Sequence, residues 1–321
     1  MAVTRAMGTV QVVGNLTTDL IVRGLPELPV WGQEVAGTEH VSIAAGQAGY
    51  LAQGLVRLGC ATRLLGIVGD DAPGGSIRDA LSASGVDVAS ITTSRLRPTA
   101  LTIALVRPDG ERAFVSDFAC QRDLDAGFVE RSCRSLRDVA ALCVVGLFNL
   151  PSLSPEQLLP SFARARSEGV LTVLDTGWDP DGWASETVAG TKALLAETDL
   201  FLPNRQEAHA LTGLEDSAAA ATTLQQIGGG TVVVKCGADG AVACDAHESV
   251  TAAASRVDAR DAVGAGDAFN AAFLFAHLRG TPLRQSMEFA NAAAGLYVTR
   301  DEQRHASEED VRAAMRAGAA S

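Results

Sequence analysis

Short apolar runs of strand length alternate along most of the chain with longer segments in which apolar residues recur at helical spacing. The strand-like runs are Val10–Gly14, Thr62–Gly66, Ala141–Val145, Leu171–Asp175, Leu200–Leu202 and Thr231–Lys235. The helical segments are Ala48–Leu58, Ser76–Ser84, Pro155–Glu168, Gln206–Leu211, Ala218–Ile227, Asp267–Arg279 and Leu283–Thr299. Continuous apolar strands separated by helices indicate a parallel sheet covered on both faces. We therefore predict an α/β fold with a mostly parallel central sheet and a site at the carboxyl ends of its strands.

Two segments depart from this alternation. Residues 20–43 and 99–118 are rich in alternating, β-branched positions and contain no helical segment between their strands. Thr99–Val106 and Glu111–Asp117 predict a hairpin, because Pro108-Asp109-Gly110 between them is typical of a turn. These strands could extend the main sheet at its edge or form a small separate sheet.

Composition and charge narrow the classes of protein. The chain has 321 residues, 47% hydrophobic and 20% charged, as in a globular domain, and no apolar run long enough to span a membrane. The formal net charge of −12 opposes binding to nucleic acid or to an anionic membrane. The first residues contain no signal-peptide pattern, and the six cysteines form no C-x-x-C pair, so we expect a cytoplasmic protein with reduced thiols.

Several common catalytic motifs are missing from the sequence. There is no G-x-x-x-x-G-K-[ST], which excludes a P-loop kinase. There is no H-E-x-x-H, G-x-S-x-G or Rossmann G-x-G-x-x-G either, which removes the main hydrolase and dehydrogenase interpretations.

The segment Asp261–Asn270 carries the strongest chemical signal. Its glycines Gly264 and Gly266 stand directly before Asp267, where an apolar helical pattern begins. Backbone N–H groups at a helix N-terminus suit a phosphate, and an acid at the same turn suits a base that takes a proton from a hydroxyl. The alternative is an ordinary helix start with Asp267 in its first turn.

Four further segments contain candidate site residues, each with a structural alternative. Asp19 follows the first strand and could bind hydroxyls or cap a turn. Ala45–Ala52 opens a helix whose Tyr50 could contact a ligand or lie in the core. Asn204 and Glu207 could organise a cation, but they also form a capping-box pattern. Lys235–Gly240 could bind phosphate or be a tight turn between strands.

These motifs, taken in order, resemble those of the ribokinase-like (PfkB) carbohydrate kinases. Asp261–Asn270 matches D-T-x-G-A-G-D-x-F, with Ala262 for the threonine. Ala45–Ala52 is similar to G-G-x-x-x-N-x-A, with Ala45 for the first glycine and Tyr50 for the asparagine. Pro203–Glu207 resembles the N-x-x-E element, and Val234–Gly240 resembles V-T-L-G-x-x-G, with Lys235 for the threonine.

The resemblance implies a three-layer ribokinase-like fold with a small β-sheet lid. The catalytic domain would comprise residues 1–19, 44–98 and 119–321, and the lid residues 20–43 and 99–118. In this family the lid is often also the contact of a homodimer. Thr299–Ser307 lacks the Gly-Ala pair of members that a monovalent cation activates, at Asp301–Gln303, so the resemblance does not extend to such activation.

The resemblance also implies a role for each candidate residue, with ATP and Mg²⁺ as cofactors. Asp267 would be the base, with Gly264, Ala265 and Gly266 forming the anion hole. The sugar would contact Asp19, Gly46, Gln47, Tyr50 and Phe114. The nucleotide would contact Asn204, Lys235, Gly237, Gly240 and Asn291, with Glu207 serving Mg²⁺ directly or through water.

The acceptor remains open between several classes of compound. In the family, the phosphofructokinase-like branch binds its sugar phosphate through basic residues of the lid. Two of those positions hold Gln33 and Ala113 in this chain, a third holds Arg97, and Arg112 is one residue away from a match. Because two of the basic residues are missing, we expect an unphosphorylated acceptor, namely a free hexose, pentose or sugar acid. A nucleoside is the alternative, because Trp31, Tyr50, Phe114, Phe118 and Phe148 could stack against a base. A member that binds a sugar without catalysis is a further alternative.

Overall fold

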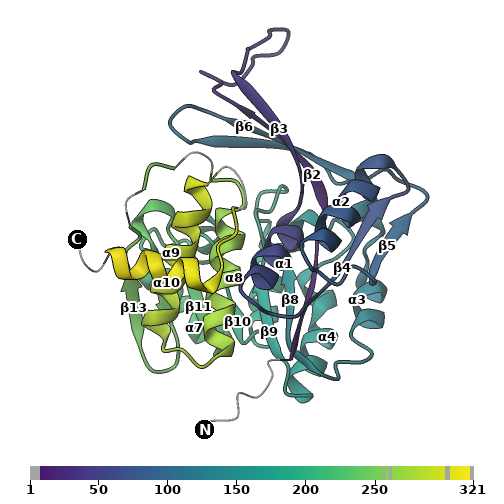
Figure 1. Cartoon of the computed structure of the whole chain (residues 1–321). Coiled ribbons are helices and arrows are strands. Elements are labelled where there is room, and N and C mark those ends of the chain that lie inside the picture. Colours follow the sequence, from purple (N-terminus) through teal and green to yellow (C-terminus); the bar gives the residue numbers. More distant parts are fainter. Residues whose placement is uncertain (1–7, 256, 260–261, 301–303, 319–321) are drawn as a thin grey trace.

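The strands form two separate sheets (Figure 1). The computed structural model describes residues 8–255, 257–259, 262–300 and 304–318. Within these residues, the large sheet has the strand order β13-β12-β11-β10-β9-β8-β1-β4-β5, and the small sheet β3-β2-β6-β7. The strands of the large sheet are β1 (Thr9–Gly14), β4 (Thr62–Gly69), β5 (Ile91–Ser94), β8 (Val139–Val145), β9 (Leu171–Asp175), β10 (Leu200–Phe201), β11 (Thr231–Lys235), β12 (Ala241–Cys244) and β13 (Ser249–Ala252). Those of the small sheet are β2 (Thr17–Arg23), β3 (Glu39–Ala45), β6 (Ala100–Val106) and β7 (Arg112–Asp117).

The large sheet is mostly parallel, which confirms the prediction from the apolar runs. All its neighbouring strands from β5 to β11 are parallel, and only β12 and β13 are antiparallel. The chain passes from β1 to β4 on one side and later to β8 on the other side of β1. Such a reversal of strand order opens a crevice at the carboxyl ends of the strands.

Helices cover both faces of the large sheet. One face carries α1 (Gln47–Arg57), α2 (Ala72–Ala83), α8 (Ala265–Leu278), α9 (Leu283–Thr299) and α10 (Glu308–Gly318). The other carries α3 (Ala126–Ser132), α4 (Pro155–Ser167), α5 (Ser185–Leu195), α6 (Arg205–Thr212) and α7 (Ser217–Gly228). Val12 packs in the first core and Val13 in the second, as expected for a strand whose side chains alternate between two covered faces.

The small sheet projects beyond the carboxyl ends of the large sheet's strands (Figure 1). Strand β2 pairs with β3 in antiparallel and with β6 in parallel orientation, and β6 with β7 forms the predicted hairpin. Of the two arrangements that the residues left open, the separate sheet is therefore correct. Strand β2 begins at Thr17, so Asp19 lies within a strand and not in the loop that we expected after β1.

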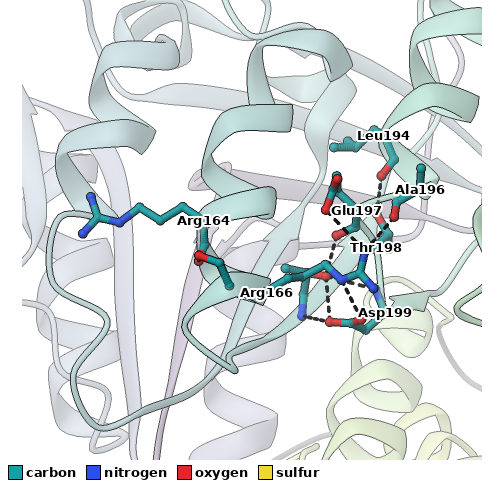
Figure 2. Close-up of polar contacts among 9 residues, drawn as sticks. Arg164, Arg166, Leu194, Ala196, Glu197, Thr198 and Asp199 are labelled. Carbon is teal, nitrogen blue, oxygen red and sulfur yellow. Dashed lines mark hydrogen bonds and ion pairs between the residues drawn. The ribbon is translucent and has the colours of Figure 1, made fainter.

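The amino ends of β9 and β10 are fixed by a polar network (Figure 2). Asp199 Oδ2 accepts from the backbone N of Thr172 at 2.9 Å and from its hydroxyl at 3.0 Å. Arg166 on α4 contacts Asp199 Oδ1 at 3.1 Å and donates to the carbonyl of Ala196 at 2.7 Å. These bonds join α4, β9 and the start of β10 at the end of the sheet opposite the predicted site.

The cysteine side chains form no disulfide among the described residues. All six cysteines are free thiols, five of them buried and Cys236 half-buried. Within the described ranges, no helix is both long and apolar enough to cross a membrane.

Candidate active site

The first turn of α8 forms the predicted glycine turn. Gly264 precedes the helix with a φ of +81°, a left-handed conformation that favours glycine, and Ala265 donates to the carbonyl of Ala262 at 3.1 Å. A Cβ at Gly264 would collide with the hydroxyl of Tyr297, so there is no room for a side chain. First-turn N–H groups have no carbonyl partner within their own helix, which leaves the turn suited to an anion. Asp261, the first residue of the motif, lies outside the described residues.

Asp267 is a buried carboxyl group in this first turn, with 7% of its surface exposed. Burial, followed by the charge of Asp175, raises its pKa well above the ordinary value, while Lys235 opposes this shift. Asp19 and Glu207 raise the pKa further. A carboxylate in this environment holds a proton more strongly than one in water, which suits a general base.

Lys235 lies beside the same turn and is bound to two buried residues. Its Nζ donates to Asp175 Oδ2 at 2.6 Å and to Asn270 Oδ1 at 3.2 Å. Asn270 Nδ2 in turn donates to Asp175 Oδ2 at 2.6 Å. Burial alone would lower the pKa of Lys235, but Asp175 and then Glu207 outweigh burial and raise it, so the ammonium stays charged at neutral pH.

Asp175 and Asn270 were not among the predicted site residues. Asp175 ends β9, and Asn270 lies on α8 one turn after Asp267. The sequence held one usable signal for Asp175, an acid at the carboxyl end of the apolar strand Leu171–Asp175.

Asn204 and Glu207 form the capping box at the start of α6. Asn204 Oδ1 accepts from the backbone N of Glu207 at 2.9 Å, and Glu207 Oε2 accepts from the backbone N of Asn204 at 2.8 Å. The carboxylate is 3% exposed, and burial, followed by the charge of Asp175, raises its pKa to about 7. The structural alternative for this motif is therefore confirmed, and the charge of the same carboxylate also acts on Lys235 and Asp267.

The carboxylates suit Mg²⁺ only as a loosely held ion. No group of three or more His, Cys, Asp or Glu residues in the described part of the chain could enclose a metal. Burial and then the charge of Asp175 raise the pKa values of Glu207 and Asp267, and the half-buried Lys235 lowers both. Mg²⁺ commonly keeps several waters and binds one or two carboxylates together with substrate phosphates, and this donor set fits that mode.

Asp19 points from the small sheet toward α1, and two hydroxyl groups bind it. Thr17 donates to Asp19 Oδ1 at 2.6 Å and Tyr50 donates to Oδ2 at 3.0 Å. The ring of Tyr50 packs with Ile21, Ala104 and neighbouring apolar residues of one buried cluster. Tyr50 is therefore a core residue, as its structural alternative expected, and its hydroxyl binds the predicted sugar-binding carboxylate. Contact of Tyr50 with a ligand stays a prediction.

Gly46 and Gln47 lie at the start of α1, next to the loops that follow β1 and β8. Gly46 has a φ of +91°, and a Cβ there would collide with the carbonyl oxygen of Asn15. Gln47 Oε1 accepts from Asn149 Nδ2 at 2.9 Å. Asn149 is a further polar residue at this edge that the sequence motifs did not include.

The other predicted contacts lie on β7, on α9 and in the turn after β11. Gly237 and Gly240 form the tight turn between β11 and β12, with φ values of +60° and +95°. Asn291 is buried, and its Nδ2 donates to the carbonyl of Ala252 at 2.9 Å, so its amide holds the end of β13. Phe114 on β7 is 52% exposed. Their roles in binding stay predictions, and Asp301–Gln303, which bear on cation activation, lie outside the described residues.

Comparisons with known proteins show the family to which the chain belongs. The family described as pfkB family carbohydrate kinase matches residues 7–310. Ribokinase of Haemophilus influenzae is 26% identical over 297 residues, covering 91% of this chain and 92% of that protein. The ATP-dependent ribose-1-phosphate kinase of Halopiger xanaduensis is 29% identical over 303 residues, covering 94% of this chain and 96% of that protein.

A solved structure shows the same fold. The ribokinase of Arabidopsis thaliana complexed with ribose and ATP superposes with a TM-score of 0.79 at 22% identity, covering 96% of this chain and 98% of that one. The chain therefore has the ribokinase fold, and the kinases among its relatives support a phosphotransferase. The chain belongs to the pfkB family of carbohydrate kinases, whose members phosphorylate sugars or nucleosides.

Proposed function

We propose that the protein transfers the γ-phosphoryl group of ATP to a hydroxyl group of a small sugar, namely a free hexose, a pentose or a sugar acid. The observation that carries this proposal is the buried Asp267 in the first turn of α8, directly after the left-handed Gly264. That arrangement offers a proton acceptor and an anion site at one point, which is what phosphoryl transfer to a hydroxyl needs.

The proposed reaction has one proton transfer and one displacement at phosphorus. Asp267 takes the proton of the acceptor hydroxyl, and the hydroxyl oxygen forms a bond to the γ-phosphorus. The bond from that phosphorus to the β,γ-bridging oxygen breaks, and ADP leaves with the bonding electrons. The N–H groups of Gly266 and Asp267 stabilise the charge on the transferring oxygens, whereas that of Ala265 already donates to the carbonyl of Ala262 and shapes the turn.

The remaining residues bind and orient the two substrates. Asp19, Gly46 and Gln47 would hold the sugar, with Tyr50 beside Asp19. Lys235, Gly237, Gly240 and Asn291 would line the nucleotide side. Asn204 and Glu207 would hold Mg²⁺ through water, since the carboxylate of Glu207 already accepts from Asn204. When bound, Mg²⁺ would neutralise charge on the phosphates.

The two sheets support a further proposal about the small one. We propose that residues 20–43 and 99–118 act as a lid over the catalytic domain formed by residues 1–19, 44–98 and 119–321. Strand β2 would carry the acceptor-binding Asp19 at the base of this lid. The exposed apolar residues of the lid, Leu28, Val30, Trp31, Leu101, Phe114 and Val115, suit a homodimer contact.

A coupled assay for ADP tests the proposed reaction. The protein is mixed with Mg-ATP and a panel of free sugars, sugar acids, sugar phosphates and nucleosides, and we expect ADP release with a member of the first two groups. Absence of ADP with every compound, together with saturable binding of a sugar, would support the non-catalytic member instead.

A nucleoside kinase is the second candidate function, and one feature favours it. Phe148 follows β8, and its ring lies edge-on to that of Trp183 with 5.1 Å between centroids. Trp178 lies edge-on to Trp183 at 5.9 Å and is 52% exposed. Aromatic faces beside an acceptor site suit a nucleobase, and ADP release that is fastest with a nucleoside would select this function.

The pH dependence of the reaction should respond in opposite directions to two substitutions. Activity requires ionised Asp267, so kcat/KM for the acceptor falls when the pH drops through the raised pKa of this group. Lys235 lowers that pKa and Asp175 raises it. Lys235→Met should therefore move the acid limb to higher pH and Asp175→Asn to lower pH. A pH–rate profile at saturating ATP measures this, and shifts in the same direction would contradict it.

Tyr50→Phe should separate acceptor binding from nucleotide binding. The substitution removes a buried hydrogen bond to a carboxylate, so we expect a loss of about 2 kcal/mol in the free energy of unfolding. The KM for the acceptor should change while the KM for ATP stays within about twofold. Thr198→Val is the control, because it removes a buried hydroxyl bond, to Leu194, at the other end of the sheet (Figure 2). An equal change in both KM values for Tyr50→Phe would refute this role.

A further inference from the structure

Asp175 uses its two carboxylate oxygens on different parts of the site. Oδ2 accepts from Lys235 Nζ and from Asn270 Nδ2, both at 2.6 Å. Oδ1 accepts from the backbone N of Gly177 at 3.0 Å. The side chain of Asp175 is only 2% exposed. One buried carboxylate therefore joins the loop after β9, the end of β11 and the first half of α8.

The ammonium group of Lys235 is held at the proposed phosphate site. Its Nζ lies 3.7 Å from the position that a Cβ on Gly266 would occupy, so it stands beside the turn that precedes Asp267. An ammonium has three N–H donors. Within the part of the chain that the structure describes, Asp175 and Asn270 take two of them, and one remains for a phosphate oxygen.

The stability of the fold does not by itself account for the ion pair between Asp175 and Lys235. Burying two charges is costly, and a buried pair can often be replaced by apolar residues without loss of stability. Lys235 also lies close enough to Asp267 for each charge to act on the other. Without Asp175, the acids left to attract the ammonium would be Glu207 and then Asp267. Asp175 therefore has a positional effect, because its bond holds Lys235 Nζ beside Gly266 and not against either of these acids.

The opposite oxygen of Asp175 reaches toward the proposed acceptor residues. Gly177 has a φ of +66°, and a Cβ there would lie 2.9 Å from Gln47 Oε1, so the loop after β9 packs on the start of α1. In Asp175→Asn, the carbonyl oxygen of the side chain would still accept the Gly177 N–H. The charge that binds Lys235 would be lost, so this substitution changes the bond to Lys235 and keeps the bond to Gly177.

We infer that Asp175 is a positioning residue that, with Asn270, fixes the ammonium of Lys235 as the cation that receives the nucleotide's phosphates. The inference rests on the proposed function. It adds a residue that acts through Lys235 and that the sequence motifs do not contain. An ion pair that only stabilised the fold would not affect nucleotide binding.

Binding of Mg-AMP-PNP, measured by calorimetry, tests the inference without knowledge of the acceptor. We expect Asp175→Asn and Lys235→Met each to raise the Kd about 10- to 100-fold, the range for loss of a charge-assisted bond. The double variant has no buried unpaired charge and should bind about as weakly as Lys235→Met alone, because Asp175 acts through Lys235.

Asp199→Asn is the matched control. Like Asp175, Asp199 accepts a backbone N–H, that of Thr172 on β9, and pairs with a cation, Arg166, but at the opposite end of the sheet (Figure 2). It should lower the melting temperature and leave the Kd unchanged. The inference would be overturned if Asp175→Asn kept a Kd within twofold of wild type. It would also be overturned if the increases in Kd of the two single variants multiplied in the double variant. Failure of the wild-type protein to bind Mg-AMP-PNP would instead overturn the proposed function.

Discussion

Asp267→Asn should lower kcat by about 10³-fold, within the range for loss of a positioned general base. The amide matches the carboxylate in shape but cannot take the proton of the acceptor hydroxyl. Affinity for Mg-AMP-PNP should be retained, because the N–H groups of the first turn of α8 are unchanged. Single-turnover kinetics and calorimetry on the same protein measure the two effects.

The stability of this variant gives a second readout. The pKa of Asp267 is raised in the folded protein, so the native state holds the proton to a higher pH than the unfolded chain does. The carboxyl thus favours folding most at low pH, and this contribution is lost as the pH rises through the raised pKa. Asp267→Asn removes that loss and should unfold at a higher denaturant concentration than wild type at neutral pH.

Asp125→Asn is the control for both measurements. Asp125 caps α3 by accepting from the backbone N of Phe128 at 2.8 Å, and asparagine caps a helix equally well. This variant should keep wild-type turnover and stability. If Asp267→Asn kept near-normal turnover with a good acceptor, the proposed mechanism would be wrong.

Gly264→Ala should have the largest effect on stability among the substitutions considered. A left-handed alanine costs about 1–2 kcal/mol, and the new Cβ would collide with the hydroxyl of the buried Tyr297. Overpacking of this kind adds about 1–3 kcal/mol. We expect a total loss of about 2–5 kcal/mol in the free energy of unfolding, and a fall in kcat because the turn proposed to bind the transferring phosphoryl group is displaced.

Gly280→Ala provides the comparison, because Gly280 lies just beyond the other end of α8. Its φ is +71°, close to that of Gly264, and no atom lies within 4 Å of a Cβ built there. Only the backbone cost should appear, about 1–2 kcal/mol, with unchanged turnover. Chemical denaturation of the two variants measures the difference, and equal losses would show that the contact with Tyr297 is unimportant.

Much of the fold could be predicted from local pattern. The predicted bounds of the strand Thr231–Lys235 are correct, because a short continuous apolar run that ends in a charged residue is typical of a buried parallel strand. Helix α2 begins at Ala72, four residues before the prediction, since Asp71 caps it by accepting from the backbone N of Gly74 at 2.9 Å. Helix α5 was missed because Gly190 interrupts a weakly amphipathic segment.

The candidate site could be predicted where its residues belong to one short stretch of chain. Gly264 and Asp267 are three residues apart, so their geometry follows from a single helix start. Asp175 and Lys235 are 60 residues apart, and nothing local indicates that their side chains meet. Lys235 was expected to face a phosphate, and its bonds to Asp175 and Asn270 depend on the order of β9, β10 and β11 in the sheet.

The placement of Asp19 has a consequence for how such an enzyme can change over evolution. Asp19, the proposed acceptor-binding carboxylate, stands on β2 of the small sheet and binds Tyr50 of α1, whereas Asp267 and Lys235 belong to α8 and β11. Tyr50, however, packs in one buried cluster with Val263, the residue before the glycine turn, and its ring lies against the position of a Cβ on Gly264. A substitution at Tyr50 that changes the acceptor therefore also reaches the turn proposed to bind phosphate, so selection for a new substrate at this position acts on both parts of the site at once.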